Sequence, residues 1–159
     1  MVKVNWVLAL LIYVLASPAY GSGVLTEQRV KDLLGAVRVS VDRRDVDGII
    51  NNFTKDAWLA FDMPAEMGGR RAMTVSEYRQ ILTQTFALTQ SYEYEVTELT
   101  IIVSKDGRRA LVTDTITERL AVPGHIIQTR TEETIEVVST PQGARISRLF
   151  GQLRRLRSL

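Results

Sequence analysis

The sequence contains no cysteine, and that absence removes several kinds of site at once. A chain without cysteine has no disulfide bond, no thiol nucleophile and no zinc site built on cysteine. Histidine is almost as scarce, because His125 is the single one and lies in an expected turn. A metal site made of several histidines is therefore excluded, and we expect no metal ion and no bound cofactor.

An excess of charge of one sign is also missing. The 159 residues include 20 lysines and arginines and 18 acidic residues, which leaves a formal net charge of +2. A domain that binds nucleic acid usually carries a clear basic patch, so we expect no nucleic-acid partner. With 45% hydrophobic residues, the chain suits one globular domain with a core of its own.

Long apolar runs are confined to the N-terminus, where residues 4–15 are apolar apart from Asn5. A helix of this length reaches about 18 Å, which is short of a hydrocarbon core of roughly 30 Å. With Lys3 before the run and small residues after it, residues 1–21 are typical of a secretory signal peptide. The alternative is an uncleaved membrane anchor, which would be the chain's contact with a membrane.

Cleavage is expected after Ala19 or Gly21, and residues 22–159 then form the mature domain. An exported chain without cysteine fits the bacterial periplasm or the extracellular space. The C-terminal end is basic, because three arginines lie within residues 153–157. We interpret this tail as solvated charge, with contact to anionic lipid as the alternative.

Three helices are predicted between residues 26 and 89. The first begins after Thr26, which can cap it, and its apolar residues recur at helical spacing: Val30, Leu33, Leu34, Val37 and Val41. Asp45 can cap a short second helix over residues 46–53. The third helix follows Thr74, which with Glu77 has the pattern of a capping box.

The remaining segments have the patterns of strands. Residues 57–61 are apolar throughout and too short for a helix, whereas residues 62–71 are expected to be a loop. Four strands joined by short turns follow the third helix: residues 92–103, 109–122, 126–138 and 144–150. We predict an α+β fold in which the helices cover one face of an antiparallel sheet, made of this four-strand meander and the short first strand.

The stretch from Asp42 to Phe53, which leads into Asp56 and Ala57, resembles a recurring pattern of the nuclear transport factor 2-like superfamily. The order helix, short helix, strand, helix and meander is similar to that superfamily over the whole mature chain. Its members include SnoaL-like polyketide cyclases, ketosteroid isomerases and limonene epoxide hydrolases. The resemblance implies a cone-shaped, strongly curved sheet around an apolar pocket, and a homodimer formed through the opposite face of the sheet. Because the superfamily includes enzymes, ligand binders and interaction modules, the fold does not define the function.

Strand register brings two acids of the meander together. An even-numbered loop between its second and third strands pairs Val112 with Ile135, which keeps the apolar residues on one face. The same register places Asp114 directly across from Glu133, with their Cβ atoms about 5 Å apart. On the other side of Asp114, the preceding turn places Leu99 opposite it. Both acids are then expected on the face that points into the cone.

Two carboxyl groups this close cannot both ionise cheaply, so one should keep its proton near neutral pH. A pair of this kind is suited to general acid–base chemistry, which makes Asp114 and Glu133 the candidate catalytic residues. Glu118 lies four residues from Asp114 on the same strand, about 13 Å away, and is expected at the rim of the cone.

Two other interpretations of the acid pair remain open. Arg148 in the last strand is expected across from Ile135 and diagonal to Glu133, where it could form an inert ion network with the two acids. A β-bulge could instead shift the register and turn one acid toward solvent. The activities of the relatives do not transfer directly, because Val112 stands where limonene epoxide hydrolases have an arginine. The first helix also lacks the tyrosine of ketosteroid isomerases.

A wider set of residues is predicted to line the pocket or to pack around it. The set combines aromatic, apolar and charged side chains: Trp58, Phe61, Tyr78, Leu99, Val112, Glu118, Arg148 and Phe150. The function that we favour from the sequence is an exported module that binds a small apolar ligand, a lipid or a partner protein without catalysis. The alternative is a SnoaL-like isomerase, cyclase or hydrolase that uses Asp114 and Glu133 as acid and base.

Overall fold

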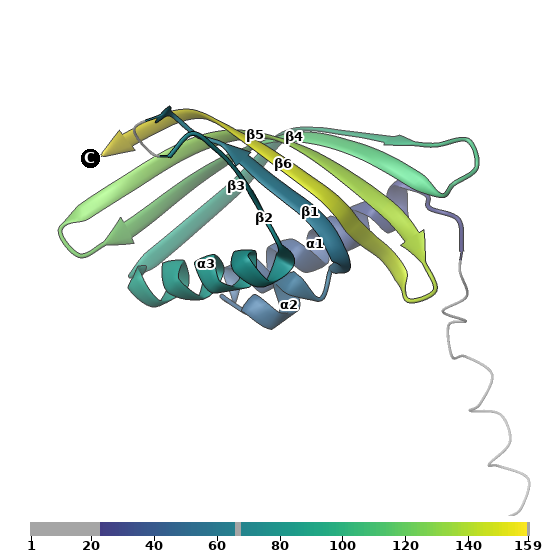
Figure 1. Ribbon diagram of the computed structural model, residues 1–159, viewed down its shortest axis with the longest axis horizontal. Helices are drawn as coiled ribbons and strands as arrows, with labels where there is room; N and C mark the ends of the chain where they lie inside the picture. Colours follow the sequence, from purple (N-terminus) through teal and green to yellow (C-terminus); the bar gives the residue numbers. More distant parts are fainter. Residues whose placement is uncertain (1–22, 66–67, 159) are drawn as a thin grey trace, which may run out of the picture.

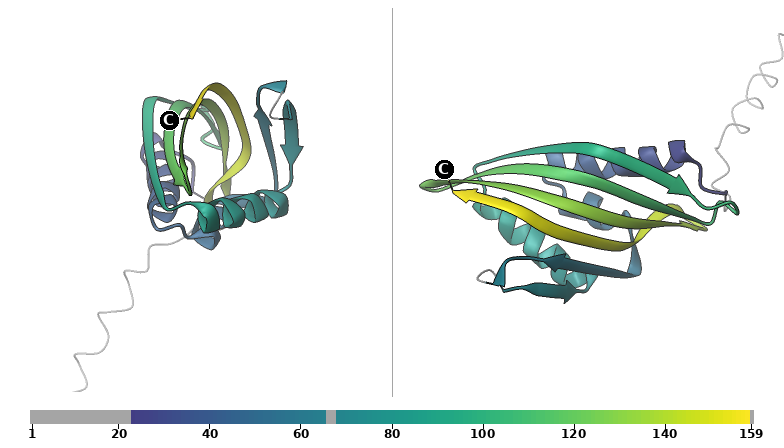
Figure 2. Two further views of the ribbon diagram at one scale, coloured as in Figure 1. Left: turned by 90° about the vertical axis from the view of Figure 1, so that its left-hand side faces the viewer. Right: turned by 90° about the horizontal axis from the view of Figure 1, so that it is seen from above.

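A curved sheet of six strands arches over three helices in the computed structural model, which describes residues 23–65 and 68–158 (Figure 1). Figure 2 shows the curvature from the end of the sheet, which stays open on one side instead of closing into a barrel. The predicted signal peptide and its cleavage sites lie outside the described residues. Within the described ranges, no helix is long and apolar enough to cross a membrane.

The three helices begin where the sequence predicts. Helix α1 (Glu27–Asp42) is capped by Thr26, whose hydroxyl accepts a hydrogen bond from the Arg29 N–H at 3.2 Å. Helix α2 (Val46–Ile50) is capped by Asp45 in the same way. It is shorter than predicted, because the chain is already extended from Phe53 onward. Helix α3 (Val75–Leu88) follows a complete capping box.

The capping box of α3 allows a first prediction. The Thr74 hydroxyl accepts from the Glu77 N–H, and the Glu77 carboxylate accepts from the Thr74 N–H at 2.7 Å. Thr74→Ala should therefore lower the free energy of unfolding by about 1 kcal/mol, since it leaves an N–H of the first turn without its partner. Urea unfolding measures the change, and Ser76→Ala, at an exposed position of the same turn, is the matched control. Equal effects of the two substitutions would show that the cap contributes nothing.

The strands confirm the four-strand meander and extend the sheet beyond it. The six strands are β1 (Phe53–Asp62), β2 (Arg70–Met73), β3 (Ser91–Val103), β4 (Arg109–Val122), β5 (His125–Thr140) and β6 (Gly143–Ser158). Their order in the sheet is β2-β1-β6-β5-β4-β3. The basic segment that we expected as a tail is part of β6.

Two features of the sheet differ from the prediction. Strand β2 begins at the end of the segment expected as a loop and pairs antiparallel with the end of β1. Gly68 and Gly69 reverse the chain between these strands, with φ angles of 104° and 66° that suit glycine. The sheet is also mixed, because β1 pairs in parallel with β6.

The core lies between the concave face of the sheet and the helices. Its most buried side chains come from α1, α2 and three strands, and each is at most 2% exposed: Val30, Ile49, Leu59, Val112 and Val137. The predicted cross-strand pairs Val112–Ile135 and Ala110–Val137 are confirmed. The register that these apolar pairs fix also decides where the acids lie.

Candidate functional site

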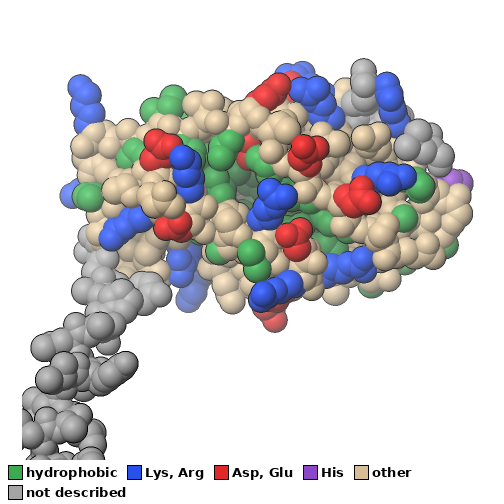
Figure 3. All heavy atoms as spheres, turned by 180° about the vertical axis from the view of Figure 1, so that it is seen from behind, with side chains coloured by type: hydrophobic (Ala, Val, Ile, Leu, Met, Phe, Trp, Pro, Cys, Tyr) green, Lys and Arg blue, Asp and Glu red, His purple; other side chains and the backbone are tan. Residues whose placement is uncertain are grey.

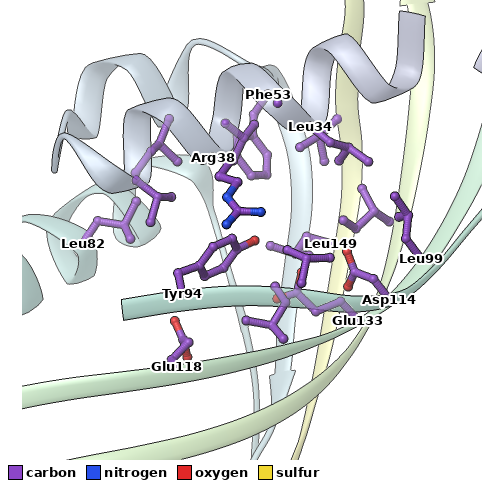
Figure 4. A pocket seen from close by; sticks show the side chains of 18 of the residues that line it. Leu34, Arg38, Phe53, Leu82, Tyr94, Leu99, Asp114, Glu118, Glu133 and Leu149 are labelled. Carbon is purple, nitrogen blue, oxygen red and sulfur yellow. The ribbon is translucent and has the colours of Figure 1, made fainter. Parts of the chain in front are cut away.

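The two candidate acids are neighbours on the concave face of the sheet. Asp114 of β4 and Glu133 of β5 are direct cross-strand partners, which confirms the predicted register. Figure 4 shows both carboxyl groups at the same cavity beneath α1. The structure therefore contradicts the alternative in which a bulge turns one of the two acids to solvent.

A β-bulge does occur on the other side of Asp114. Strand β3 pairs Thr97 with Thr115 and Thr100 with Thr113, so that Glu98 and Leu99 together face Asp114. The predicted one-to-one pairing of Leu99 with Asp114 is therefore wrong. Glu98 has a φ of 55°, and its carboxylate accepts from the Thr115 hydroxyl at 2.6 Å. The bulge leaves Leu99 in the wall of the cavity.

The cavity at the acid pair, which we term the narrow chamber, has a volume of about 290 Å³. This volume corresponds to roughly ten water molecules. Most of its wall is apolar, with contributions from α1, β3, β5 and β6: Leu34, Val37, Val96, Leu99, Ile135 and Leu149. Figure 3 shows the face that carries α1 and β3, where hydrophobic side chains form the floor of a hollow.

A second cavity, which we term the wide chamber, has a volume of about 870 Å³ and lies toward the other end of the sheet. It is lined by α3, by the end of β1 and by the tips of β4 and β5. The two chambers share six wall residues: Tyr78, Leu82, Phe86, Tyr92, Glu118 and Glu133. Glu133 therefore borders both chambers, whereas Asp114 borders the narrow one.

Aromatic rings form the partition between the chambers. Phe61 stacks on Tyr78 with ring centroids 6.0 Å apart, and Phe86 meets Tyr92 edge-on at 5.7 Å. Gly151, the cross-strand partner of Glu133, makes room for the Phe61 ring, because a Cβ there would lie 2.7 Å from that ring. A side chain at residue 151 would consequently displace a wall of the site.

Glu118, which was expected at the rim, lies in this partition and is held by hydrogen bonds. The Tyr92 hydroxyl donates to one of its oxygens, and the Thr129 hydroxyl donates to the other at 2.9 Å. The acid pair differs from Glu118, because Asp114 Oδ1 is buried without a hydrogen-bond partner. Among the residues that the structure describes, neither Asp114 nor Glu133 forms an ion pair.

These surroundings raise the pKa values of both acids, each for its own reasons. Burial raises the pKa of the Asp114 carboxyl to about 6. Burial, together with the negative charges of Asp114 and Glu118, raises the pKa of Glu133 well above its ordinary value. Both shifts favour the protonated carboxyl, and the negative charge of Asp114 opposes ionisation of Glu133, so the two acids do not ionise together.

Tyrosine hydroxyls near the pair stay protonated. Burial raises the pKa of Tyr94 far above the physiological range, and the charges of Glu133 and Asp114 raise it further. Burial also raises the pKa of Tyr78 strongly, with Glu133 as the next cause. Figure 4 shows the Tyr94 hydroxyl directed into the space that Asp114 faces. Protonated hydroxyl donors thus lie beside the acid pair in one apolar chamber.

Arg148 does not join the acid pair, and the prediction that placed it there is wrong. Leu149 is the partner of Ile135, whereas Arg148 lies opposite Glu136. An irregularity between Ile146 and Arg148 shifts the register by one residue, which turns Arg148 and the residues directly after it to the face opposite to the predicted one. The inert ion network of Asp114, Glu133 and Arg148 is therefore absent from the structure.

Two aromatic residues expected at the pocket also lie on the convex face. Trp58 is the partner of Arg148 on β1 and is 47% exposed. Phe150 follows Arg148 by two residues, and its ring lies under the guanidinium of Arg70 at 5.2 Å. Neither Trp58, Arg148 nor Phe150 is a wall residue of the two chambers.

The other expected wall residues divide between the chambers and the core. Phe61 lines the wide chamber, Leu99 the narrow one, and Tyr78 and Glu118 both. Val112 is fully buried in the core. Among the polar wall residues that the sequence reasoning missed are Arg38 on α1 and Tyr94 on β3. Their spacing could have indicated these positions. Arg38 follows Leu34 by four residues on a helix and Tyr94 precedes Val96 by two on a strand, so each shares a face with an apolar wall residue.

The cost of ionising Asp114 predicts an unusual response to substitution. Its pKa in the folded state, about 6, exceeds the unfolded value of about 3.9, so the folded protein loses stability as pH rises through this window. Asp114→Asn removes the charge. After allowance for solvent screening, it should raise the free energy of unfolding by about 1 to 2 kcal/mol at about pH 8 and have little effect near pH 4.

Urea unfolding at the two pH values measures this difference. The matched control is Glu132→Gln, since Glu132 is exposed on the opposite face and pairs with Arg154 at 2.8 Å. A loss of stability at about pH 8 in Asp114→Asn would contradict the account, because that is the response of a carboxylate in a structural ion pair.

No protein-family model matches the sequence, and no curated protein matches it. Solved structures do share the fold. A candidate aromatic ring hydroxylase from Novosphingobium aromaticivorans is 20% identical, with a TM-score of 0.68 over 83% of this chain and 92% of that chain. A candidate scytalone dehydratase from the same organism is 9% identical, with a TM-score of 0.70 over 82% and 85%. A ketosteroid isomerase-like protein from Erwinia carotovora is 16% identical, with a TM-score of 0.62 over 80% and 95%.

These similarities confirm the predicted α+β fold with a strongly curved sheet, which is the architecture that the resemblance to the nuclear transport factor 2-like superfamily implies. Identities at this level establish the architecture and leave the activity to be argued from the site itself. Among residues 23–65 and 68–158, no group of three potential metal ligands lies close enough together to hold a metal ion.

Proposed function

We propose that the protein is an enzyme that performs general acid–base catalysis on a small, largely apolar molecule bound at the acid pair. Asp114 is the proposed base and Glu133 the proposed acid. The observation that carries this proposal is the pair itself: two adjacent carboxyl groups in an apolar chamber, with Asp114 Oδ1 buried and unpartnered.

The acid pair lacks the hydrogen-bond donors or the cation that would offset its burial, and this favours a catalytic role over a structural one. A buried carboxyl group without a hydrogen bond costs stability, and a structural acid is normally given donors or a cation. Glu118 in the partition has two such donors, whereas the Asp114 oxygen has none. In enzymes, two titratable groups of one cavity whose pKa values differ strongly often serve as the catalytic acid and the catalytic base.

The arrangement suits proton transfer at a carbon atom next to a carbonyl group. Ionised Asp114 can accept the proton at neutral pH, since its pKa of about 6 lies close to the working range. The negative charge then develops on the carbonyl oxygen. Neutral Glu133 and the Tyr94 hydroxyl can donate hydrogen bonds to that oxygen, in a chamber whose apolar walls strengthen them.

Isomerisation and elimination are the reaction classes that such a transfer begins. Two proteins of the same fold support this range by name, one as a candidate scytalone dehydratase and the other as a ketosteroid isomerase-like protein. Hydrolysis is a weaker fit, because Arg148 cannot complete an Asp–Arg–Glu triad from the convex face.

Hydrogen–deuterium exchange tests the proposal before the reaction is known. The protein is incubated in D₂O with a panel of small ketones, enones and keto acids, and the exchange of the protons next to the carbonyl is followed by NMR. We expect catalysed exchange of at least one compound, lost in Asp114→Asn and retained in Glu132→Gln. Absence of exchange for every compound that binds would contradict catalysis.

A second candidate function is an exported, non-catalytic module that holds a small apolar ligand or a lipid. The wide chamber favours it, because about 870 Å³ of largely apolar space exceeds what proton transfer at the pair requires. Native mass spectrometry of the protein purified from an exporting host tests this candidate. A copurified apolar ligand would support it, and the same spectrum reports leader cleavage and the proposed homodimer.

A further inference from the structure

Arg38 brings a positive charge to a chamber whose other ionisable wall groups are mainly acids. It lies in the C-terminal half of α1, four residues after Leu34 and three before Val41, so it shares the helix face that covers the narrow chamber. Figure 4 shows its guanidinium directed into the chamber, toward the space bordered by Tyr94 and Asp114.

No acid of the described chain neutralises this guanidinium. Lys31, the other cation in the wall, pairs with Glu27 at 2.6 Å, and Arg79 on α3 pairs with Asp47. Among the residues that the structure describes, Arg38 takes part in no ion pair and no side-chain hydrogen bond. Burial is the cause of the raised pKa of Asp114.

We infer that the narrow chamber selects small apolar molecules that carry a carboxylate, and that Arg38 is the group that binds this carboxylate. The inference rests on the proposed function, since it names the class of substrate for the same site. A guanidinium matches a carboxylate with two parallel N–H donors, which a neutral ligand cannot use. Without Arg38, ionised Asp114 would repel an anionic ligand.

The positions of the charged groups also orient such a ligand. Arg38 reaches in from the helix side, whereas Asp114 and Glu133 lie in the sheet opposite. A carboxylate held at Arg38 therefore leaves the other end of the molecule at the acid pair. The apolar wall between them, which includes Leu34 and Leu149, suits an aromatic or short aliphatic body.

The experiment compares a matched pair of probes that differ in charge and hardly in shape. Binding of 4-fluorophenylacetate and 4-fluorophenylacetamide is measured by ¹⁹F NMR at neutral pH. We expect the wild-type protein to bind the carboxylate at least about tenfold more tightly than the amide, a ratio that one charge-assisted contact can supply. In Arg38→Gln the preference should disappear or reverse.

The control is Arg43→Gln, because Arg43 is the exposed C-cap residue of the same helix and lies outside both chambers. It should retain the preference, and Arg38→Lys should show an intermediate one, since lysine keeps the charge without the paired donors. Three results would overturn the inference: no carboxylate binding up to about 10 mM, equal binding of the two probes, or an unchanged preference in Arg38→Gln.

Asp114→Asn separates this inference from the proposed function. Carboxylate binding should persist or tighten in this variant, because a repelling charge is removed while Arg38 remains. If the carboxylate preference holds and no compound undergoes catalysed exchange, the catalytic proposal fails and the assignment of Arg38 stands. If exchange occurs with neutral ketones and the preference is absent, the assignment of Arg38 fails alone.

Discussion

Asp114→Asn should lower the rate of catalysed proton exchange by about 10² to 10⁴-fold, which is the contribution expected of a general base. Asparagine has nearly the shape of aspartate and cannot accept the proton. Because the shape hardly changes, the substitution leaves the packing around this residue, which is 7% exposed, intact. The same variant should be more stable than the wild-type protein at about pH 8, so unfolding cannot explain the loss of activity.

Glu133→Gln should have a smaller effect, roughly tenfold, because glutamine retains an N–H donor for the carbonyl oxygen. The pH profile of the wild-type protein should rise with an apparent pKa of about 6, since Asp114 acts in its ionised form. Activity in Asp114→Asn that equals the wild-type rate would contradict the assignment of the base. A pH profile without a rise near pH 6 would contradict the raised pKa of Asp114.

Leu59→Ala should give the largest loss of stability, about 2 to 5 kcal/mol. Leu59 is fully buried at the point where β1 joins the two parts of the sheet, opposite Met73 of β2 and Leu149 of β6. Its removal leaves a cavity that rigid strands on both sides cannot close.

Urea unfolding measures this loss, with Lys55→Ala as the matched control in the same strand. Lys55 is exposed, and its replacement should change the free energy of unfolding by less than about 0.5 kcal/mol. A change below about 1 kcal/mol in Leu59→Ala would contradict the position of β1 between β2 and β6, because it would place Leu59 outside the core.

The meander could be predicted from the sequence because its signals are local. Alternating strands and short turns fix which residues face each other, and this register extends from Ala110 and Val137 to the acid pair. The pairing of β1 with β6 has no such signal, since the two strands are parallel and far apart in sequence. Strand β2 was missed because four residues between a glycine pair and a helix resemble a loop.

The site could be predicted in part for the same reason. Asp114 and Glu133 follow from the parity of two long strands, whereas the position of Arg148 depends on a single irregular residue in β6. Ser147 lies at that irregularity, where its hydroxyl donates to the Glu136 carboxylate at 2.9 Å. A serine within a strand does not by itself predict a β-bulge. Arg38 was missed because helical spacing defines a face and not the cavity that the face covers.

The titration of the two carboxyl groups distinguishes an acid–base pair from two ordinary solvated carboxylates. ¹³C NMR of protein labelled at the aspartate and glutamate carboxyl carbons, assigned with Asp114→Asn and Glu133→Gln, follows each group through the pH range. We expect Asp114 to titrate near pH 6 and Glu133 to titrate well above its ordinary value. Titration of both groups near their ordinary values of about 3.9 and 4.3 would contradict this expectation, because the pair would then be two solvated carboxylates with no proton to exchange.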